Sequence, residues 1–445
     1  MINPEPCYNF ESQTECNSLI RDLPCSFVLN EENFECRAEI ILDPDCSLDI
    51  RTEIPLDLYE YFSLISSMSS TKSIILNGLK ISAFVSQVSS SSDEKAIITF
   101  TPNQEPIPLF GDDESKMSKV IFHLFDFKDR KGTSRKVIRS ENSAYTLGVT
   151  ELASPKWKVE LHEIKSAEKS DSKKNRYPTL THVCILHRRD GSEFDGKTAR
   201  QMMLDLRLFF TFSQGFFCSP VMPVGFDNNE RQVWAEGSSP DPNVKNSMSW
   251  FDPYNSEQLA RLFPHFMVKL EDERWWDTFH SIIYWYSRSN NTSGSGIDTG
   301  IILTQIAIER LAYEFAFDNP KCNGFKDFCE IKNPSDRFRY LFTLLDIPLE
   351  FPTNFTKIKK ISSQEGIRDG PYFLTAVRNS MVHPDNKRRG LFKDLYYDAW
   401  RLGMWYLELS ILRICNYEGS YANRLRQERH IGEVEEVPWC MKQET

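Results

Sequence analysis

The spacing of the apolar residues changes once along the 445-residue chain, near residue 253. Before that point, the apolar stretches are rich in β-branched and aromatic residues and alternate over parts of their length, as half-buried strands do. These stretches are residues 73–88, 95–101, 119–127, 157–164 and 181–187. After it, apolar residues recur every three or four positions, which is typical of one face of a helix. The sequence therefore predicts an α+β protein whose strands come first and whose helices come last.

This change of pattern also predicts the domain organisation. The helical spacing indicates helices over residues 256–270, 271–289, 298–317, 335–346 and 393–417, with a further one approaching His383. One helix, residues 196–217, falls inside the strand-rich half. We expect four parts: an acidic segment that packs on or leads into the β domain (1–60), a β-rich domain (61–227), a linker rich in Ser, Pro, Asn and Asp (228–255), and a helical domain (256–430).

Negative charge is concentrated at the start of the chain. The net charge is −10, but residues 1–60 hold 14 acidic and three basic residues, so the remaining 385 residues have a net charge of +1. Two interpretations stay open for this segment. Phe34, Ile40 and Ile54 suggest structural strands. Alternatively, the segment docks onto basic surfaces elsewhere and restrains the protein's activity until a trigger displaces it.

The start of the chain has neither a basic region nor an apolar core of the kind found in secretory signals. No stretch approaches the roughly 18 uninterrupted apolar residues that a spanning helix needs. We therefore expect a soluble cytoplasmic protein that makes no contact with a membrane. Five of the eleven cysteines lie before residue 47, but without the paired knuckles of a zinc site, so we expect reduced thiols and no metal or other cofactor.

An arginine followed five or six residues later by a histidine occurs four times, so the bare pattern carries little information. Arg176 and His182 are separated by Pro178, and the pair runs into a predicted strand. Context also argues against two others: Arg274 and His280 lie among aromatic residues, and Arg424 and His430 lie in a polar terminal stretch.

The remaining pair, Arg378 and His383, lies at the end of an apolar helical stretch. Pro384 disfavours helical backbone at the residue before it, so we expect the helix to end at His383. Asn379 is one turn away from His383 and next to Arg378.

These three side chains suit the cleavage of an RNA phosphodiester. A histidine can exchange a proton with the 2′-hydroxyl or the leaving oxygen, an arginine can hold the phosphate, and an asparagine can orient either group. The simpler interpretation is that His383 caps its own helix and that Arg378 pairs with an acidic residue such as Glu309. The residues alone leave both interpretations open.

The segment Ala376-Val377-Arg378-Asn379-Ser380-Met381-Val382-His383-Pro384 resembles the R-N-x-x-x-H signature of HEPN (higher eukaryotes and prokaryotes nucleotide-binding) domains. The surrounding segments 306–311, 335–341 and 405–409 agree with this resemblance. The likeness is to the HEPN domain of ApeA-type abortive-infection proteins, which carry a mostly β N-terminal domain. It covers about residues 298–424 and is only architectural before that.

The resemblance implies an all-α HEPN bundle that forms a homodimer and acts as a metal-independent endoribonuclease, often a toxin or antiphage effector. It implies that Arg378, Asn379 and His383 are catalytic, with Glu309 a candidate partner of Arg378. The implied substrate is RNA, such as tRNA or another cellular RNA, and the β-rich domain would sense a trigger or guide the substrate. The alternative is a non-catalytic dimeric module that binds RNA, a nucleotide or a protein.

Two basic clusters are candidates for phosphate contacts. The first follows the motif and consists of Lys387, Arg388, Arg389 and Lys393. The second lies in the N-terminal half and consists of Lys128, Arg130, Lys131, Arg135, Lys136 and Arg139. A solvated loop is the alternative interpretation of the second cluster.

Overall fold

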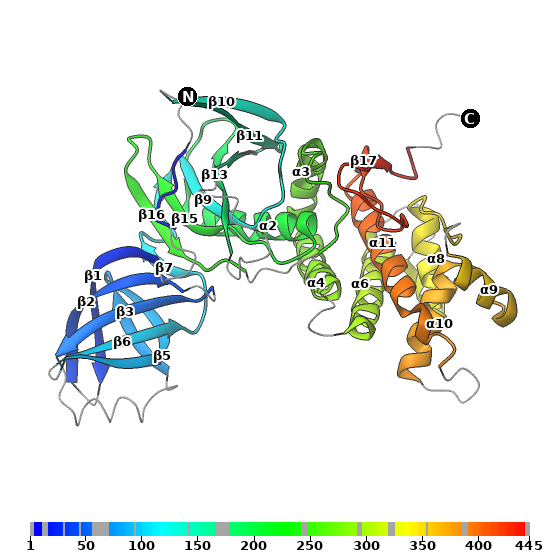
Figure 1. Ribbon diagram of the computed structural model, residues 1–445, viewed down its shortest axis with the longest axis horizontal. Helices are drawn as coiled ribbons and strands as arrows, with labels where there is room; N and C mark the ends of the chain where they lie inside the picture. The colour runs from blue at the N-terminus through cyan, green and yellow to red at the C-terminus, as the bar shows by residue number, and fades with distance from the viewer. Residues whose placement is uncertain are drawn as a thin grey trace.

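The computed structural model has three parts in a row: a small barrel, a large twisted sheet and a group of helices (Figure 1). The chain is thus of the mixed α+β class, with strands in its N-terminal half and helices in its C-terminal half. The structure describes residues 4–10, 17–29, 32–43, 46–55, 71–92, 95–140, 143–164, 178–241, 247–291, 296–318, 325–352, 355–383 and 390–440.

The first described strands close into a barrel with the order β1-β2-β3-β6-β5-β4. All of its pairs are antiparallel, and β1 closes the barrel on β4 with Cys25 opposite Leu76. Alternate residues point inward and are buried, among them Ile50, Ile74 and Ile98. The strands are β1 (Asn17–Leu29), β2 (Glu32–Leu42), β3 (Leu48–Pro55), β4 (Thr71–Leu76), β5 (Leu79–Ser92) and β6 (Lys95–Pro102).

The acidic segment at the start of the chain therefore contributes three of the barrel strands, β1, β2 and β3. Glu39 pairs with Arg51 across 3.4 Å and Glu53 pairs with Lys95 across 2.6 Å, whereas Asp49 is buried and accepts a hydrogen bond from the hydroxyl of Thr101 at 2.6 Å. Within the described residues, the structural interpretation of this segment holds. The period-two alternation explains the arrangement, because it places apolar and acidic side chains on opposite faces of each strand.

The stretch 73–88, expected from the sequence as one run, is a hairpin of β4 and β5. Its turn is formed by Asn77 and Gly78, which have φ angles of 50° and 79°. Asparagine followed by glycine favours this left-handed geometry, because both tolerate positive φ.

The second sheet has eight described strands in the order β10-β11-β12-β13-β9-β15-β16-β7, again antiparallel. Its elements are β7 (Ile107–Phe110), β9 (Lys119–Phe125), β10 (Ser134–Ser140), β11 (Ser143–Ala153), β12 (Trp157–Glu163), β13 (Leu180–Arg188), β15 (Val221–Phe226) and β16 (Gln232–Gly237). Two short strands, β8 (Lys116–Met117) and β14 (Phe194–Asp195), pair with each other beside it.

Helix α2 (Gly196–Gln214) packs on this sheet, and Phe210 contacts Phe122 and Phe127 with ring centroids 6.3 and 5.3 Å apart. The side chain of Asp195 caps the helix by accepting a hydrogen bond from the backbone N–H of Thr198. The helix ends at Gln214, which places this residue beside the connection to the helical half.

Residues 228–255, expected to be a linker, are largely built into the fold. They include strand β16, which lies between β15 and β7 in the sheet. Trp250 is fully buried and contacts Phe212 of α2 and Tyr417 of the C-terminal segment (residues 415–440). Polar composition alone did not reveal that the few apolar residues of this stretch enter the core.

The helical half consists of α3 (Glu257–Leu270), α4 (Glu273–Asn290), α6 (Ile297–Asp318), α7 (Phe325–Glu330), α8 (Pro334–Leu344), α9 (Thr356–Glu365), α10 (Gly370–Val382), the 3₁₀ turn η1 (Lys393–Leu395), α11 (Tyr396–Ile414), and the short strands β17 (Ser420–Tyr421) and β18 (Glu435–Glu436). Helix α6 packs between α4 and α11, and α10 packs against α8, α11 and α6 (Figure 1). The apolar cores of the helices and of the large sheet are continuous. In the part of the chain that the structure describes, no helix has the length and apolar character required to cross a membrane.

Candidate functional site

Helix α10 carries the predicted motif, and its sequence explains where the helix begins. Asp369 precedes the first turn and accepts a hydrogen bond from the N–H of Tyr372. The guanidinium of Arg339 on α8 donates to both carboxylate oxygens of Asp369, at 2.8 and 3.0 Å. A bidentate pair of this kind fixes geometry as well as charge. The start of α10 is therefore fixed to α8.

The position of the motif on α10 follows from the helix's apolar face. Phe373, Leu374 and Val377 are buried against the neighbouring helices. Arg378 lies at the edge of this face and is half-buried, whereas Asn379 is exposed. Because burial of the apolar face sets the rotation of the helix, the motif lies at the boundary between core and solvent.

The helix ends where the sequence predicted. Val382 is its last residue, and the backbone N–H of His383 still donates to the carbonyl oxygen of Asn379, 2.8 Å away. His383 is exposed, with φ and ψ of −123° and 79°. Nη1 of Arg378 donates to Oδ1 of Asn379 across 3.2 Å. The structure thus places all three predicted residues at the C-terminal end of α10, with His383 directly after its last residue.

Glu309 on α6 is an electrostatic neighbour of this turn. Burial raises the pKa of its carboxyl group, and the positive charges of Arg378 and Arg337 act in the opposite direction. Glu309 is exposed, and the structure relates it to Arg378 through charge, so its role as the partner of Arg378 stays a prediction.

The structure describes only some members of the two predicted basic clusters. Lys393 is exposed in η1, but Lys387, Arg388 and Arg389 lie outside the described residues. In the second cluster, Arg130, Lys131 and Arg135 are exposed, Lys128 is half-buried, and the side chains of Lys136 and Arg139 lie outside what the structure describes. Lys128 therefore differs from the exposed members of its cluster.

The other arginine–histidine pairs have structural roles where they are described. Arg274 forms an ion pair with Asp318 across 3.0 Å and lies over the ring of Phe317. Arg424, expected in a polar stretch, is buried and pairs with Glu408 of α11. The described contacts of Arg274 and Arg424 are thus those of structural ion pairs.

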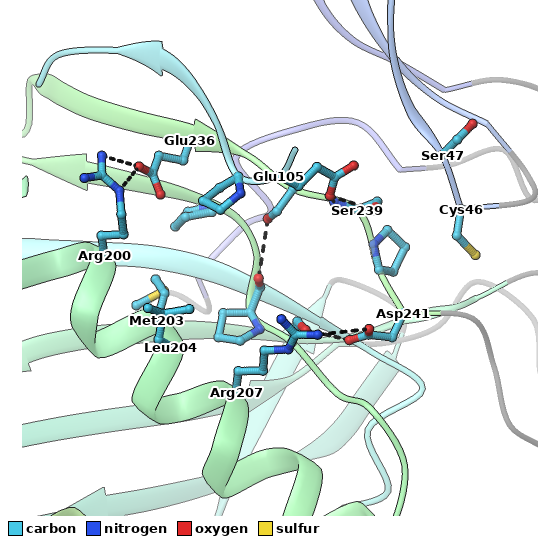
Figure 2. Close-up of a pocket in the computed structure, with 16 residues that line it drawn as sticks. Cys46, Ser47, Glu105, Arg200, Met203, Leu204, Arg207, Glu236, Ser239 and Asp241 are labelled. Carbon is cyan, nitrogen blue, oxygen red and sulfur yellow. Dashed lines mark hydrogen bonds and ion pairs between the residues drawn. The ribbon is translucent and has the colours of Figure 1, made fainter. Parts of the chain in front are cut away.

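A cavity of about 450 Å³ lies at the junction of barrel and sheet. The sequence did not predict it. Figure 2 shows Arg200 and Arg207 of α2 on one side, with Cys46 and Ser47 of the barrel opposite. Arg200 pairs with the buried Glu236 across 2.5 Å, and Arg207 lies 3.9 Å from Asp241. Apolar walls with charged groups at defined places are typical of small-molecule sites.

Its lining comes from parts of the chain far apart in sequence. In addition to the residues above, it includes Glu105, Pro106, Met203, Leu204, Ser219, Pro220, Pro223, Ser238, Ser239 and Pro240. The helical spacing of residues 200, 203, 204 and 207 in the sequence was the available signal, because it places them on one face of α2. It could not reveal what lies opposite.

Together these features define a class: an α+β protein with an N-terminal β barrel, a large antiparallel sheet and a C-terminal group of helices, one of which ends in an Arg-Asn-x-x-x-His sequence. Residues 112–246 match the YopA central domain, and residues 272–436 match the YopA C-terminal domain. The chain is 30% identical over 334 residues to the SPbeta prophage-derived uncharacterized protein YopA of Bacillus subtilis (strain 168), covering 73% of each chain. The protein therefore belongs to the YopA family. No solved structure matches it significantly.

Proposed function

We propose that this protein is a metal-independent endoribonuclease of the HEPN type that acts as a toxin or antiphage defence effector. The observation that carries the proposal is the last turn of α10, where Arg378 hydrogen-bonds Asn379 and an exposed His383 ends the helix. A histidine whose backbone completes a helix while its side chain faces solvent is accessible to a substrate.

The proposed reaction follows from the chemistry of the three side chains. His383 carries out one of two proton transfers, taking the proton of a 2′-hydroxyl or supplying one to the departing 5′-oxygen, and solvent water carries out the other. The 2′-oxygen attacks the adjacent phosphorus, and the bond from phosphorus to the 5′-oxygen breaks. Arg378 stabilises the added negative charge on the phosphate oxygens, and Asn379 holds the guanidinium in position. The charge of Glu309 attracts the guanidinium of Arg378.

The proposed assembly is a homodimer through the helical domain. Ile306 and Glu309 are three residues apart on α6 and therefore lie on the same face of that helix. Ile306 and Val382, which precedes His383, are 38% and 41% exposed. Apolar side chains exposed beside the motif are typical of a surface that another protein chain covers.

Other features support parts of the proposal. Lys393 is an exposed candidate for contact with RNA phosphates. The cavity between barrel and sheet supports a sensing role for the β-rich half, because a ligand bound there would contact both parts. The prophage origin of the B. subtilis relative favours a role in the biology of phages and their hosts.

The deciding experiment compares wild type, His383→Ala and His280→Ala on total cellular RNA, with and without EDTA. His280 is an exposed helical histidine that stacks on Trp276 and serves as the matched control. We expect wild type and His280→Ala to cleave and His383→Ala to be inactive. Equal cleavage by wild type and His383→Ala contradicts the catalytic assignment, and loss of wild-type cleavage in EDTA contradicts metal independence.

The exposed apolar side chains also favour a second candidate, a non-catalytic dimeric module that binds RNA, a nucleotide or another protein. Under this alternative, the cellular phenotype survives His383→Ala but is lost with Ile306→Asp. Val268→Asp on α3 is the matched control, because Val268 is equally apolar and 50% exposed.

A further inference from the structure

A second cavity, of about 190 Å³, lies where the large sheet, the connection after it and the C-terminal segment meet. Lys128 follows β9, Gln214 ends α2, and Arg429 belongs to the C-terminal segment. The remaining lining residues are Ser213, Ser247, Met248, Ser249, Phe251, Asp252, Pro253, His430 and Ile431. Two cations are thus brought together from positions 301 residues apart in the chain.

The amide of Gln214 presents an unused donor. Its side chain is 2% exposed, and its Oε1 accepts a hydrogen bond from the backbone N–H of Lys128 at 2.9 Å. This bond fixes which end of the amide carries oxygen, so the other end is the N–H₂ group. Among the described residues, Nε2 is buried without an acceptor. A buried donor without a partner costs free energy unless a bound molecule supplies an acceptor.

Arg429 and Lys128 also have N–H groups that are unpaired or form only long hydrogen bonds among the described residues. Nη1 of Arg429 is also buried without an acceptor within the described part of the chain, and Nη2 donates only a long hydrogen bond of 3.5 Å to the carbonyl of Phe251. Nζ of Lys128 donates to Ser247 at the same long distance of 3.5 Å. Distances of this length are at the limit of hydrogen bonding.

The electrostatics of the cavity favour an anion. Burial lowers the pKa of Lys128, and the nearby charges of Arg130 and Arg429 lower it further, against the opposing effect of Asp126. Burial likewise lowers the pKa of Arg429. A negative charge placed between the two would offset both effects.

The negative charges of Glu408 and Asp252 oppose the effect of burial on the pKa of Arg429, but both oxygens of Asp252 already accept backbone hydrogen bonds. Oδ1 of Asp252 accepts the backbone N–H of Tyr254 at 2.9 Å, and Oδ2 accepts the backbone N–H of Gly432 at 2.6 Å. These two bonds hold the carboxylate against the backbone of its own segment and of the C-terminal segment.

We propose that this cavity binds a phosphate group, held by the ammonium of Lys128, the guanidinium of Arg429 and the amide N–H₂ of Gln214. Donors that converge from three segments suit an ion with several oxygens, and guanidinium and ammonium groups are the usual phosphate ligands. The cavity is smaller than the roughly 300 Å³ at which drug-sized sites begin. It therefore fits inorganic phosphate or the end of a small phosphate monoester. A phosphate bound there joins the sheet to the C-terminal segment.

The test measures binding to the full-length protein by calorimetry, with inorganic phosphate, glycerol phosphate and acetate at constant ionic strength. We expect one phosphate per chain and no binding of acetate. Binding of glycerol phosphate as well would identify the end of a monoester as a ligand, and binding of phosphate alone would identify the free ion. The proposal is overturned if phosphate does not saturate a site or if acetate binds equally well.

The decisive variant is Gln214→Glu, which has nearly the same shape. It keeps the oxygen that accepts from Lys128 and replaces the N–H₂ group by a carboxylate oxygen. We expect phosphate binding to be lost, together with the phosphate-dependent rise in melting temperature, while the fold is retained. Arg429→Met should weaken binding by about tenfold or more. Lys131→Met removes the same charge from an exposed position nearby, and an equal loss in that control would overturn the site.

Discussion

Arg424 and Glu408 form an ion pair in which the side chains are 0% and 1% exposed, with Nη2 and Oε1 2.5 Å apart. Tyr286 of α4 donates a further hydrogen bond to Oε1 of Glu408 at 2.7 Å. The pair thus joins the C-terminal segment to α11 and α4. It also packs Arg424 over the ring of Trp400.

The first prediction concerns this pair. Glu408→Gln keeps the size of the side chain but leaves the buried guanidinium of Arg424 without a counter-charge, so we expect a loss of about 3–5 kcal/mol in the free energy of unfolding. Glu271→Gln, which breaks an exposed pair with Lys156, should cost less than about 1 kcal/mol. Urea unfolding measures both. Equal costs would show that burial does not determine the strength of the pair.

The second prediction concerns the cap of α10. Asp369→Ala removes both the acceptor for Tyr372 and the partner of Arg339, so we expect a loss of about 1–2 kcal/mol in the free energy of unfolding. Asp369→Asn keeps a capping oxygen and should recover part of this loss. Thermal unfolding of the two variants distinguishes them. If Asn is no better than Ala, the capping hydrogen bond is not what stabilises this end.

The third prediction separates charge from geometry at the proposed active site. Arg378→Lys keeps a positive charge but loses the planar guanidinium that donates to Asn379. We expect RNA cleavage to fall by about 10²-fold, as for the loss of one well-placed donor to a transition state. Arg378→Ala should fall further. Measured cleavage rates at saturating RNA test this order, and full activity of Arg378→Lys would reduce the role of Arg378 to charge alone.

The fourth prediction concerns pH and the buried His123 of β9. Its Nε2 lies 3.1 Å from the backbone N–H of Cys7 and its Nδ1 lies 3.0 Å from the carbonyl of Val221. The neutral ring satisfies both contacts, with Nε2 accepting and Nδ1–H donating. Burial lowers the pKa of His123 to about 4, from its ordinary value of 6.5.

Because the unfolded chain binds a proton below pH 6.5 and the folded chain does not until about pH 4, stability falls as pH drops through this range. Between pH 7.5 and 5.5, we expect His123 alone to remove about 1.4 kcal/mol from the free energy of unfolding. Urea titrations of wild type and His123→Gln at both pH values measure this difference. An NMR titration in which the wild-type ring protonates near pH 6.5 would contradict it without reference to any variant.

Much of the local structure could be predicted from the sequence. The helix at residues 196–217 corresponds to α2 (Gly196–Gln214), and the end of α10 was predicted from Pro384 to lie at His383. The first prediction rests on the helical spacing of apolar residues, and the second on the restriction that proline places on the residue before it. Asn77 and Gly78 could also have predicted the hairpin turn, but they lie within residues 73–88, which were taken as one apolar stretch.

The two cavities and the buried pair of Arg424 and Glu408 could not be predicted in the same way. Lys128 was grouped with exposed basic residues. The sequence shows that these basic residues lie close together in the chain, but not that the side chain of Lys128 is half-buried. Arg424 was taken for part of a polar tail, although its partner Glu408 is only 16 residues away. In both cases, burial depends on which distant segment covers the side chain.

The sequence by itself determined the α+β class, the order of its two halves and the helix that carries Arg378, Asn379 and His383. These properties follow from the spacing of apolar residues, which repeats every 3.6 residues in a helix and every two residues in a strand. The pattern is therefore visible within a short stretch of sequence. Only the tertiary structure decided that β1 closes a barrel on β4, that Trp234 and Trp250 enter the core, and that Lys128 and Arg429 line one cavity. Such pairings join segments far apart in the chain, and the packing of whole elements selects them.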